Sequence, residues 1–461
     1  MIARWLDRID QQRPAEPKRS KPPRLRAVPE QDSQRPVGRR ASGARTFSRP
    51  AERHGHLTTS AHIQAAYPWQ IQAGLPRGSI VGRQAWGGVF TFDQWIAYEL
   101  GLVADPNVIV LGLLGQGKSA LAKTLCLRQQ VFGRRVEILD RKSEYRPLID
   151  ALGGVVVRLE PGTRINPLER VIGRESRESL LRAVARALLK RDLRPCEGLG
   201  LALALEAVDE RFSEREVVIP DLIAELREPS QLLAAGMDLS RSECAAELRE
   251  LTYALRGLEA GPLRGLFDGP TTHGESTWSR QAVCVDIEGL ARTLYGEDES
   301  TAVALALMCS TAFLDGRRRG QDAKTVRLND EAWRAIAVHP AYYAASLKLS
   351  RASGVSTMFA VHRLSDLSAS GDQGSRAQQL ATGLLAEIST RVIYRQSPNE
   401  IPATVAALGL TDTERDYMPR LGKGQALWRV GSRGYLVQHQ VTAAEWPLID
   451  TDHLMRDRSA A

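Results

Sequence analysis

Short apolar runs alternate with amphipathic segments along most of the chain, and this alternation predicts strands separated by helices. The predicted strands are 79–81, 88–92, 107–111, 135–139, 154–158, 282–285, 325–329, 356–361, 391–394, 425–430 and 435–438. A short helix is expected at 93–99, and a longer one, rich in Ala, Leu, Lys and Gln, at 119–131. Strands that alternate with helices favour an α/β fold with a mostly parallel sheet.

The middle of the chain has a different pattern. From 176 to 264 the periodicity is helical, with good helix segments at 179–189 and 199–208 and only a weak strand signal at 217–219. We therefore expect an all-helical insertion in the α/β core. The predicted divisions are a tail at 1–56, the first part of the core at 57–170, the insertion at 171–265 and the rest of the core at 266–461.

The octapeptide GLLGQGKS at 112–119 fits the pattern G-x-x-x-x-G-K-[ST], between a predicted strand and a predicted helix. In such a loop, glycines let backbone N–H groups cradle phosphates, the lysine reaches the β- and γ-phosphates, and the serine hydroxyl coordinates Mg²⁺. The following helix adds the partial positive charge of its N-terminus. This context disfavours an ordinary glycine turn. The residues expected to contact ATP are Gly112, Gly115, Gln116, Gly117, Lys118, Ser119 and Ala120.

Two acidic residues, Asp330 and Glu331, follow the predicted strand 325–329. We expect this strand to lie next to the loop strand, so that Asp330 supports Mg²⁺ and Glu331 polarises the attacking water. The strand is imperfect, because Arg327 and Asn329 interrupt its apolar run. The alternative is that Asp330 simply caps a helix.

Asp140 ends another strand, 135–139, which we also expect beside the loop strand, where the ligands of such sheets gather. Asp140 holds Mg²⁺-bound water or the network that orients the base, or else it caps the helix that follows. Two nearby aromatic residues, Tyr145 and Trp333, are interpreted as packing residues.

The net positive charge of the chain is concentrated at the N-terminus. Residues 1–56 contain 14 Lys and Arg against 6 Asp and Glu, whereas the remaining residues contain 48 of each sign. With seven prolines and few β-branched or aromatic residues, this tail is predicted to be disordered. It either tethers the protein to DNA or to an anionic membrane surface, or serves only as a solubilising tail.

The overall composition, 43% hydrophobic and 25% charged, is ordinary for a globular protein. The five cysteines form no C-x-x-C pair, and the eight histidines form no metal-binding motif. The chain has neither an apolar run of about 18 residues nor a signal-peptide core. We expect a cytoplasmic protein with reduced cysteines, at most peripheral to a membrane.

Several segments together resemble the conjugation ATPases of type IV secretion systems (the VirB/TraC class), within the FtsK/HerA branch of RecA-like motors. The matching segments are 107–119, 140–145, 164–168, 266–269, 330–333, 351–356, 364–366 and 422–426. The resemblance implies a RecA-like P-loop NTPase fold, Mg²⁺-dependent ATP hydrolysis and a hexameric ring that works with channel proteins. The long N-terminal domain of many such ATPases has no counterpart, and the tail and a glycine-rich segment stand in its place.

The resemblance also implies roles for two further residue types. Where the family usually has a glutamine that senses the γ-phosphate, this chain has His362, which is otherwise a plain strand-end histidine. In the family, an arginine from one subunit completes the neighbouring site, and Arg395 is the first candidate, ahead of Arg391 and Arg351. The alternative for each is an ordinary surface arginine.

Three functions follow from these patterns. The first is an ATPase motor that powers conjugative DNA transfer or type IV secretion. The second is a DNA translocase or coupling protein of the FtsK/HerA type, whose basic tail grips DNA. The third is an inactive nucleotide-binding assembly factor, which only the irregular acidic strand supports.

Overall fold

The computed structural model describes residues 39–41, 44–46, 74–85, 87–160, 162–260, 263–293, 297–318, 323–330, 336, 342–344, 347, 352–363, 383–384 and 387–450. The chain forms two units, residues 1–68 and 69–461. In the first unit, β1 (Arg39–Ala41) and β2 (Ala44–Thr46) form an antiparallel pair. The rest of the predicted tail lies outside the described residues, so its disorder stays a prediction.

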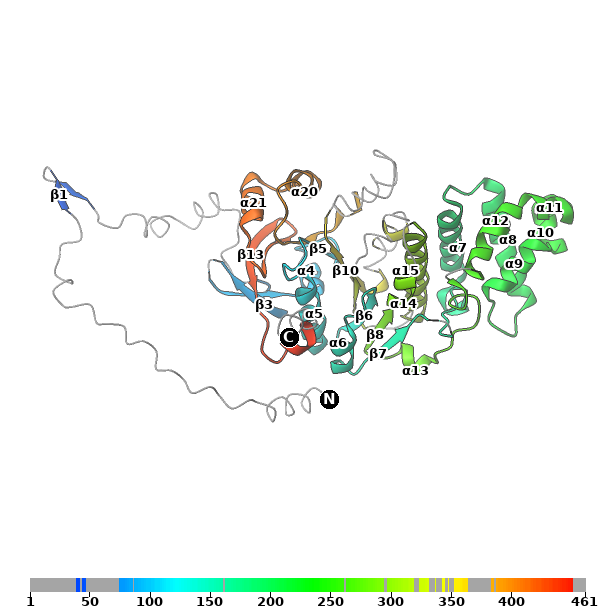
Figure 1. Cartoon of the computed structure of the whole chain (residues 1–461), viewed down its shortest axis with the longest axis horizontal. Coiled ribbons are helices and arrows are strands. Elements are labelled where there is room, and N and C mark those ends of the chain that lie inside the picture. Colours follow the sequence, from blue (N-terminus) through cyan, green and yellow to red (C-terminus); the bar gives the residue numbers. More distant parts are fainter. Residues whose placement is uncertain are drawn as a thin grey trace, which may run out of the picture. The chain divides into compact units, whose positions relative to one another are not determined.

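The second unit is built on one sheet of eleven strands, in the order β4-β3-β13-β12-β11-β5-β10-β9-β6-β8-β7 (Figure 1). The strands are β3 (Ser79–Gln84), β4 (Val89–Phe92), β5 (Val108–Leu111), β6 (Arg135–Asp140), β7 (Val155–Arg158), β8 (Ala282–Asp286), β9 (Thr325–Asp330), β10 (Val355–Val361), β11 (Thr390–Ile393), β12 (Gln425–Val430) and β13 (Arg433–His439). Each predicted strand overlaps one of them. The strands from β11 to β7 pair in parallel, and those from β11 to β4 pair antiparallel. The prediction of a mostly parallel sheet is confirmed.

The predicted positions of the two acidic strands in the sheet are wrong. Neither β9, which ends at Asp330, nor β6, which ends at Asp140, lies next to the loop strand β5. The neighbours of β5 are β10 and β11, so that β10 separates β9 from β5, and β6 lies beyond β9. Alternation along a sequence shows which segments are strands, but the order in the sheet depends on pairings between distant segments.

Side chains of the central strands alternate between two cores, one on each face of the sheet. Val108 and Val110 belong to the core that includes residues of α5 (Lys118–Gln129) and α6 (Arg146–Ala151). Ile109 and Leu111 belong to the core that includes α15 (Glu297–Arg318). Burial on both faces explains why these strands are continuously apolar.

Between β7 and β8 the described residues form helices and no strand. These helices are α7 (Arg174–Leu189), α8 (Pro195–Arg211), α9 (Ile219–Arg227), α10 (Gln231–Gly236), α11 (Arg241–Glu247), α12 (Arg249–Leu255) and α13 (Glu275–Trp278). The weak strand signal at 217–219 is wrong, since α9 begins at Ile219 and the Val217 carbonyl accepts from the Asn166 side-chain amide (2.8 Å). Helix α7 packs against α15 (Figure 1). The predicted boundaries at 170/171 and 265/266 stay predictions.

Smaller helices complete the unit. They are α4 (Gln94–Glu99), α14 (Glu288–Thr293), α20 (Ile401–Leu408), α21 (Asp412–Tyr417) and α22 (Trp446–Ile449). Asp93 caps α4 by accepting from the backbone N–H groups of Trp95 and Ile96, both at 2.9 Å. Among the helices that the structure describes, none combines the length and apolarity needed to cross a membrane.

A buried ionic cluster explains why β9 contains an arginine. Arg327 is opposite Glu137 of β6 in the parallel register, and its guanidinium lies 2.7 Å from the Glu137 carboxylate. Arg318, at the end of α15, lies 3.1 Å from the same carboxylate, and Arg135 lies 3.7 Å away. The arginine that interrupts the apolar run of β9 is therefore paired inside the core.

Candidate nucleotide-binding site

The loop at 112–119 joins β5 to α5 at the carboxyl end of the parallel strands. Gly112, Gly115 and Gly117 all have positive φ, at 154°, 72° and 109°. A Cβ on Gly112 would lie 2.5 Å from the Cβ of Tyr394, so this position has no room for a side chain. Gly117 caps the N-terminus of α5 in the left-handed conformation. Glycine is needed here both for backbone shape and for close approach.

Lys118 turns its ammonium group into the loop. Its Nζ donates to the carbonyls of Gly112 (2.5 Å) and Leu113 (2.9 Å) and lies 3.0 Å from Nδ1 of His362. Only 6% of Lys118 is exposed. The cation is therefore held at the position from which the sequence motif would contact phosphates.

His362 directly follows β10, the strand between β5 and β9. Since an ammonium group only donates, Nδ1 of His362 accepts the hydrogen bond from Lys118. The order of the strands thus places His362 at the loop and next to the acidic strand. In the sequence, only the family resemblance suggested His362 as a site residue. In the structure, its contact with Lys118 shows that it lies at the phosphate loop.

Asp330 lies at the end of β9 and is 6% exposed. Its Oδ2 accepts a hydrogen bond of 3.0 Å from the hydroxyl of Tyr145. The tyrosine, interpreted from the sequence as a packing residue, is fully buried and also has this polar contact. Glu331, the next residue, lies outside the described residues.

Asp140 uses both carboxylate oxygens to hold the turn after β6. Oδ1 accepts from the backbone N–H of Lys142 (2.9 Å) and Oδ2 from that of Tyr145 (3.1 Å). Burial raises the pKa of Asp140 to about 6, against the effect of these two hydrogen bonds, and the charges of Asp286 and Asp330 add to the increase. Asp140 therefore holds the turn and does not cap α6, because neither donor belongs to the first turn of that helix; its role toward Mg²⁺-bound water stays a prediction.

Hard oxygen donors are available for Mg²⁺. Ser119 is half-buried in the first turn of α5, and Asp330 ends β9. In the part of the chain that the structure describes, no group of three or more acidic, His or Cys side chains could hold a metal alone. Mg²⁺ is usually bound by one or two protein oxygens together with substrate phosphates, and the Ser119 hydroxyl and the Asp330 carboxylate are donors of this kind. The residues present therefore fit a Mg–nucleotide complex.

The C-terminal hairpin of β12 and β13 contacts the phosphate loop. The sequence motif gave no indication of this contact. The N–H of Gly424 donates to the carbonyl of Gln116 (2.9 Å), and a Cβ on Gly117 would lie 3.6 Å from the Cα of Gly424. Farther along α5, Thr124 Oγ1 lies 2.9 Å from Nε2 of His439. The only sequence signal for this support was the glycine pair within 422–426.

The candidate arginines differ in their surroundings. Arg391 is hydrogen-bonded within its own subunit, because its guanidinium donates to the carbonyls of Ile388 (3.0 Å) and Leu408 (2.6 Å). Arg395 is exposed, and its carbonyl accepts from the N–H of Leu113 in the loop (3.0 Å). Its side chain therefore starts beside the loop of its own subunit. Arg351, the third candidate, lies outside the described residues.

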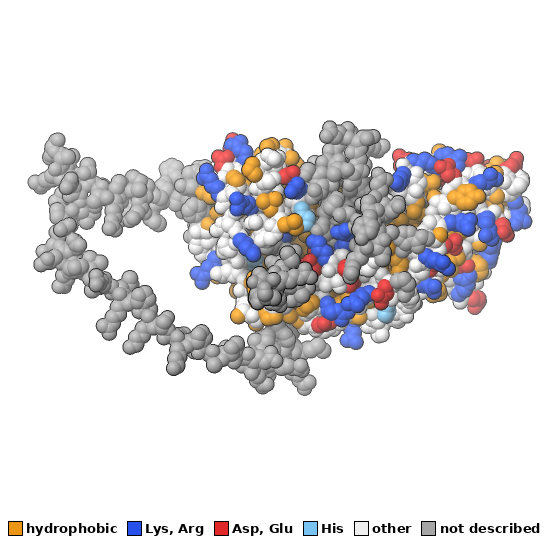
Figure 2. Space-filling model, in the orientation of Figure 1, with side chains coloured by type: hydrophobic (Ala, Val, Ile, Leu, Met, Phe, Trp, Pro, Cys, Tyr) orange, Lys and Arg blue, Asp and Glu red, His pale blue; other side chains and the backbone are white. Residues whose placement is uncertain are grey.

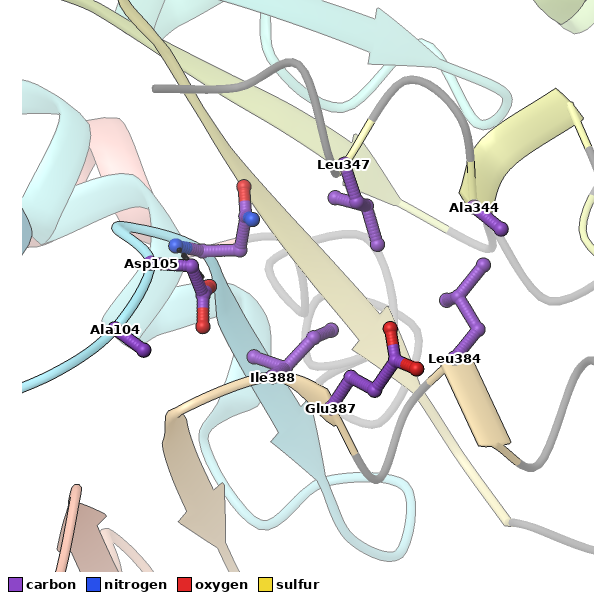
Figure 3. A pocket seen from close by; sticks show the side chains of 8 residues that line it. Ala104, Asp105, Ala344, Leu347, Leu384, Glu387 and Ile388 are labelled. Carbon is purple, nitrogen blue, oxygen red and sulfur yellow. Dashed lines mark hydrogen bonds between the residues drawn. The ribbon is translucent and has the colours of Figure 1, made fainter.

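A cavity of about 190 Å³ lies elsewhere, at the opposite end of β5. Figure 3 shows Leu347, Leu384 and Ile388 around it, with Asp105 on another side. Asp105 and Asn107 precede β5, whereas the phosphate loop follows it. This cavity is therefore not part of the nucleotide site.

No family model matches the chain, and no curated protein matches it in sequence. Solved structures do match. VirB4 of Thermoanaerobacter pseudethanolicus is similar with a TM-score of 0.63 and 21% identity, over 81% of this chain and 99% of that chain. The plasmid coupling protein TrwB in complex with ADP and Mg²⁺ is similar with a TM-score of 0.51 and 12% identity, over 85% of this chain and 95% of that chain. Its complex with a non-hydrolysable ATP analogue gives a TM-score of 0.51 and 12% identity, over 84% and 93%.

These similarities extend over most of the described chain and over nearly all of the VirB4 structure. The resemblance to conjugation ATPases that the sequence segments indicated is thus confirmed at the level of the fold. The chain has the fold of a RecA-like P-loop NTPase.

Proposed function

We propose that this protein is a Mg²⁺-dependent ATPase that powers conjugative DNA transfer or type IV secretion as a ring, with six subunits as in the family that it resembles. The observation that carries the proposal is the position of Lys118, held in a glycine-lined loop against His362. The fold shared with VirB4 and with TrwB, whose structures include complexes with an ATP analogue and with ADP and Mg²⁺, supports ATP and Mg²⁺ as ligands.

In this proposal Lys118 and the loop N–H groups bind the phosphates. Ser119 and Asp330 hold Mg²⁺, whose charge offsets the negative charge that develops on the transferred phosphoryl group. Glu331 polarises the attacking water, and His362 senses the γ-phosphate through its neighbour Lys118. Arg395 completes the site of the adjacent subunit. Channel proteins, and DNA or an anionic membrane surface bound by residues 1–56, are the proposed partners at the inner face of the cell membrane.

A DNA translocase of the coupling type is the second candidate, favoured by the similarity to TrwB. On the face seen in Figure 2, basic and acidic side chains are interspersed over the helices α7 to α12, so this surface carries no continuous basic stripe. The basic excess belongs to residues 1–56. The tail is therefore the proposed DNA-binding segment.

The third candidate, an inactive assembly factor, loses one of the two residues on which it rests. The irregularity of β9 comes in part from Arg327, which pairs with Glu137 inside the core, away from the phosphate loop. The polar residue thus has a structural reason and gives no argument against hydrolysis.

Steady-state ATP hydrolysis with and without duplex DNA tests the proposal. We expect Mg²⁺-dependent turnover in both conditions, and Lys118→Ala should abolish ATP binding and turnover because it removes the cation at the phosphates. The surface variant Lys423→Arg, which keeps the charge, serves as a control. Turnover only with duplex DNA would favour the translocase, and tight ATP binding without turnover would favour the assembly factor.

A further inference from the structure

One buried side chain, Tyr145, connects three elements around the site. It follows the turn after β6 and is the N-cap residue of α6. None of its surface is exposed, and its ring belongs to the core between the sheet and α5. Its hydroxyl reaches the end of β9, two positions from β5 in the sheet.

Two charged residues fix the position of the ring. Asp140 accepts from the backbone N–H of Tyr145 (3.1 Å) and so sets the turn that carries it. Lys123 of α5 places its ammonium group 4.9 Å from the ring centroid while donating to the carbonyl of Glu144 (3.0 Å). A buried ammonium group over an aromatic face is an attractive contact. The turn and the helix that starts at the phosphate loop thus hold Tyr145 together.

The hydroxyl of Tyr145 acts as a hydrogen-bond donor. A phenol carries one O–H donor and a carboxylate only accepts, so the hydroxyl donates to Oδ2 of Asp330 at 3.0 Å. A hydrogen bond to a carboxylate stabilises its ionised form and restricts its rotation.

We propose that Tyr145 is a positioning residue that fixes the carboxylate of Asp330 for Mg²⁺. The inference rests on the proposed function, because it assumes that Asp330 supports the metal. Groups that orient a metal-binding side chain affect metal affinity without touching the metal. Since Lys123 lies on α5, its contact with the ring of Tyr145 links the helix that follows the phosphate loop to β9, which ends at Asp330.

The test is a Mg²⁺ titration of the protein saturated with a non-hydrolysable ATP analogue, followed by analogue fluorescence. Tyr145→Phe keeps the ring and removes only the donor. We expect the half-saturating concentration of Mg²⁺ to rise on the order of 10-fold. Affinity for the analogue in EDTA should stay the same, because the phosphate loop is intact. A general loss of structure would weaken both the binding of Mg²⁺ and the binding of the analogue in EDTA.

The matched control is Tyr343→Phe. Tyr343 is also a buried tyrosine, 2% exposed, and its hydroxyl has no hydrogen-bond partner within the described chain. The half-saturating Mg²⁺ concentration of Tyr343→Phe should equal that of the wild type. In an Asp330→Asn background, Tyr145→Phe should cause no further change, because the carboxylate through which it acts is already lost.

The possible failures can be told apart. If the wild type binds no analogue or shows no dependence on Mg²⁺, the proposed function itself is wrong. If the wild type responds and Tyr145→Phe gives the same titration curve, the role of Tyr145 is overturned. Should Tyr145→Phe fail to fold, Lys123→Met decides. Loss of the charge over the ring should raise the half-saturating Mg²⁺ in the same direction, and an unchanged value overturns the proposal.

Discussion

The ammonium group of Lys118 donates to two carbonyls of its own loop and to His362. Under the proposed function, a phosphate would replace some of these acceptors when a nucleotide binds. Because His362 shares this cation, nucleotide binding would then change the hydrogen bonding at the end of β10, the strand between the loop strand and the strand that ends at Asp330.

Glu331→Gln tests the role of the residue that follows Asp330. The amide keeps the size and hydrogen bonding of the side chain but cannot polarise water as a carboxylate does. We expect ATP binding to persist and turnover to fall by about 10²-fold or more. Single-turnover hydrolysis and equilibrium binding measure the two effects separately, and unchanged turnover would refute the role of Glu331.

The residues of the loop could be predicted because they are consecutive in the sequence and have a fixed spacing. The contact of Tyr145 with Asp330 could not, since 185 positions separate the two residues and a lone buried tyrosine gives no polar signal. The same holds for Gly424 and Gln116. Their hydrogen bond depends on how a late hairpin pairs in the sheet.

At the scale of elements, β9 and β6 are joined by charge as well as by backbone pairing. Burial alone would raise the pKa of Glu137, but the guanidinium groups of Arg318, Arg327 and Arg135 lower it to about 2. The carboxylate is thus ionised in the core, and together with Asp315 it offsets the charge of the three buried arginines. This cluster lies among the strands whose ends carry Asp140 and Asp330, so it helps to keep the two in register.

Glu137→Ala should therefore destabilise the fold strongly, because Arg135 loses this carboxylate and Arg318 and Arg327 are left to share Asp315. We expect a loss of about 3–5 kcal/mol in the free energy of unfolding at pH 7, measured with urea. Glu206→Ala is the control, because it removes one member of an exposed pair with Arg174 and should cost about 1 kcal/mol or less. Similar losses in the two variants would contradict the importance of the buried cluster.

The pH dependence of the free energy of unfolding follows from the direction in which the pKa of Glu137 is shifted. The folded pKa of Glu137, about 2, is below its ordinary value of 4.5, so the folded state favours the ionised form. The resulting stability is fully present above pH 4.5 and is lost as pH falls toward 2. The contribution of Glu137 to unfolding curves should disappear in this window, and Glu137→Ala should lose less stability there than the wild type.

Strands were the elements that the sequence predicted best, because apolar runs bounded by turns are a local signal. Their order in the sheet was not accessible in the same way. The strands on either side of β5 come from 355–361 and 390–393, far along the chain. Arg327 made β9 look doubtful, since its partner Glu137 is distant in sequence.

At the scale of the whole molecule, the proposed ring requires a residue that acts between subunits. Arg395 is exposed and makes no side-chain hydrogen bond or ion pair within the described chain, which leaves its guanidinium available. Its backbone lies beside the loop of its own subunit. Action in cis and action in trans therefore need to be separated by experiment.

Mixing two inactive variants separates them. Arg395→Ala should lose turnover while each subunit still binds ATP. Mixed with an excess of Glu331→Gln subunits it should regain part of its activity, since some interfaces then pair an intact Glu331 with an intact Arg395. Arg391→Lys, which leaves Arg395 in place, is the comparison. A mixture as inactive as its components would mean that Arg395 acts in cis or is not the arginine required.

The central position of β5 also has a consequence during synthesis of the protein. Its partners β10 and β11 leave the ribosome about 250 and about 280 residues after it, which takes on the order of tens of seconds at ordinary translation speeds. Until then an apolar strand and the phosphate loop behind it lack their neighbours. An unpaired apolar strand is prone to aggregation, and under the proposed function the nucleotide site is complete only after the second half of the protein has been made.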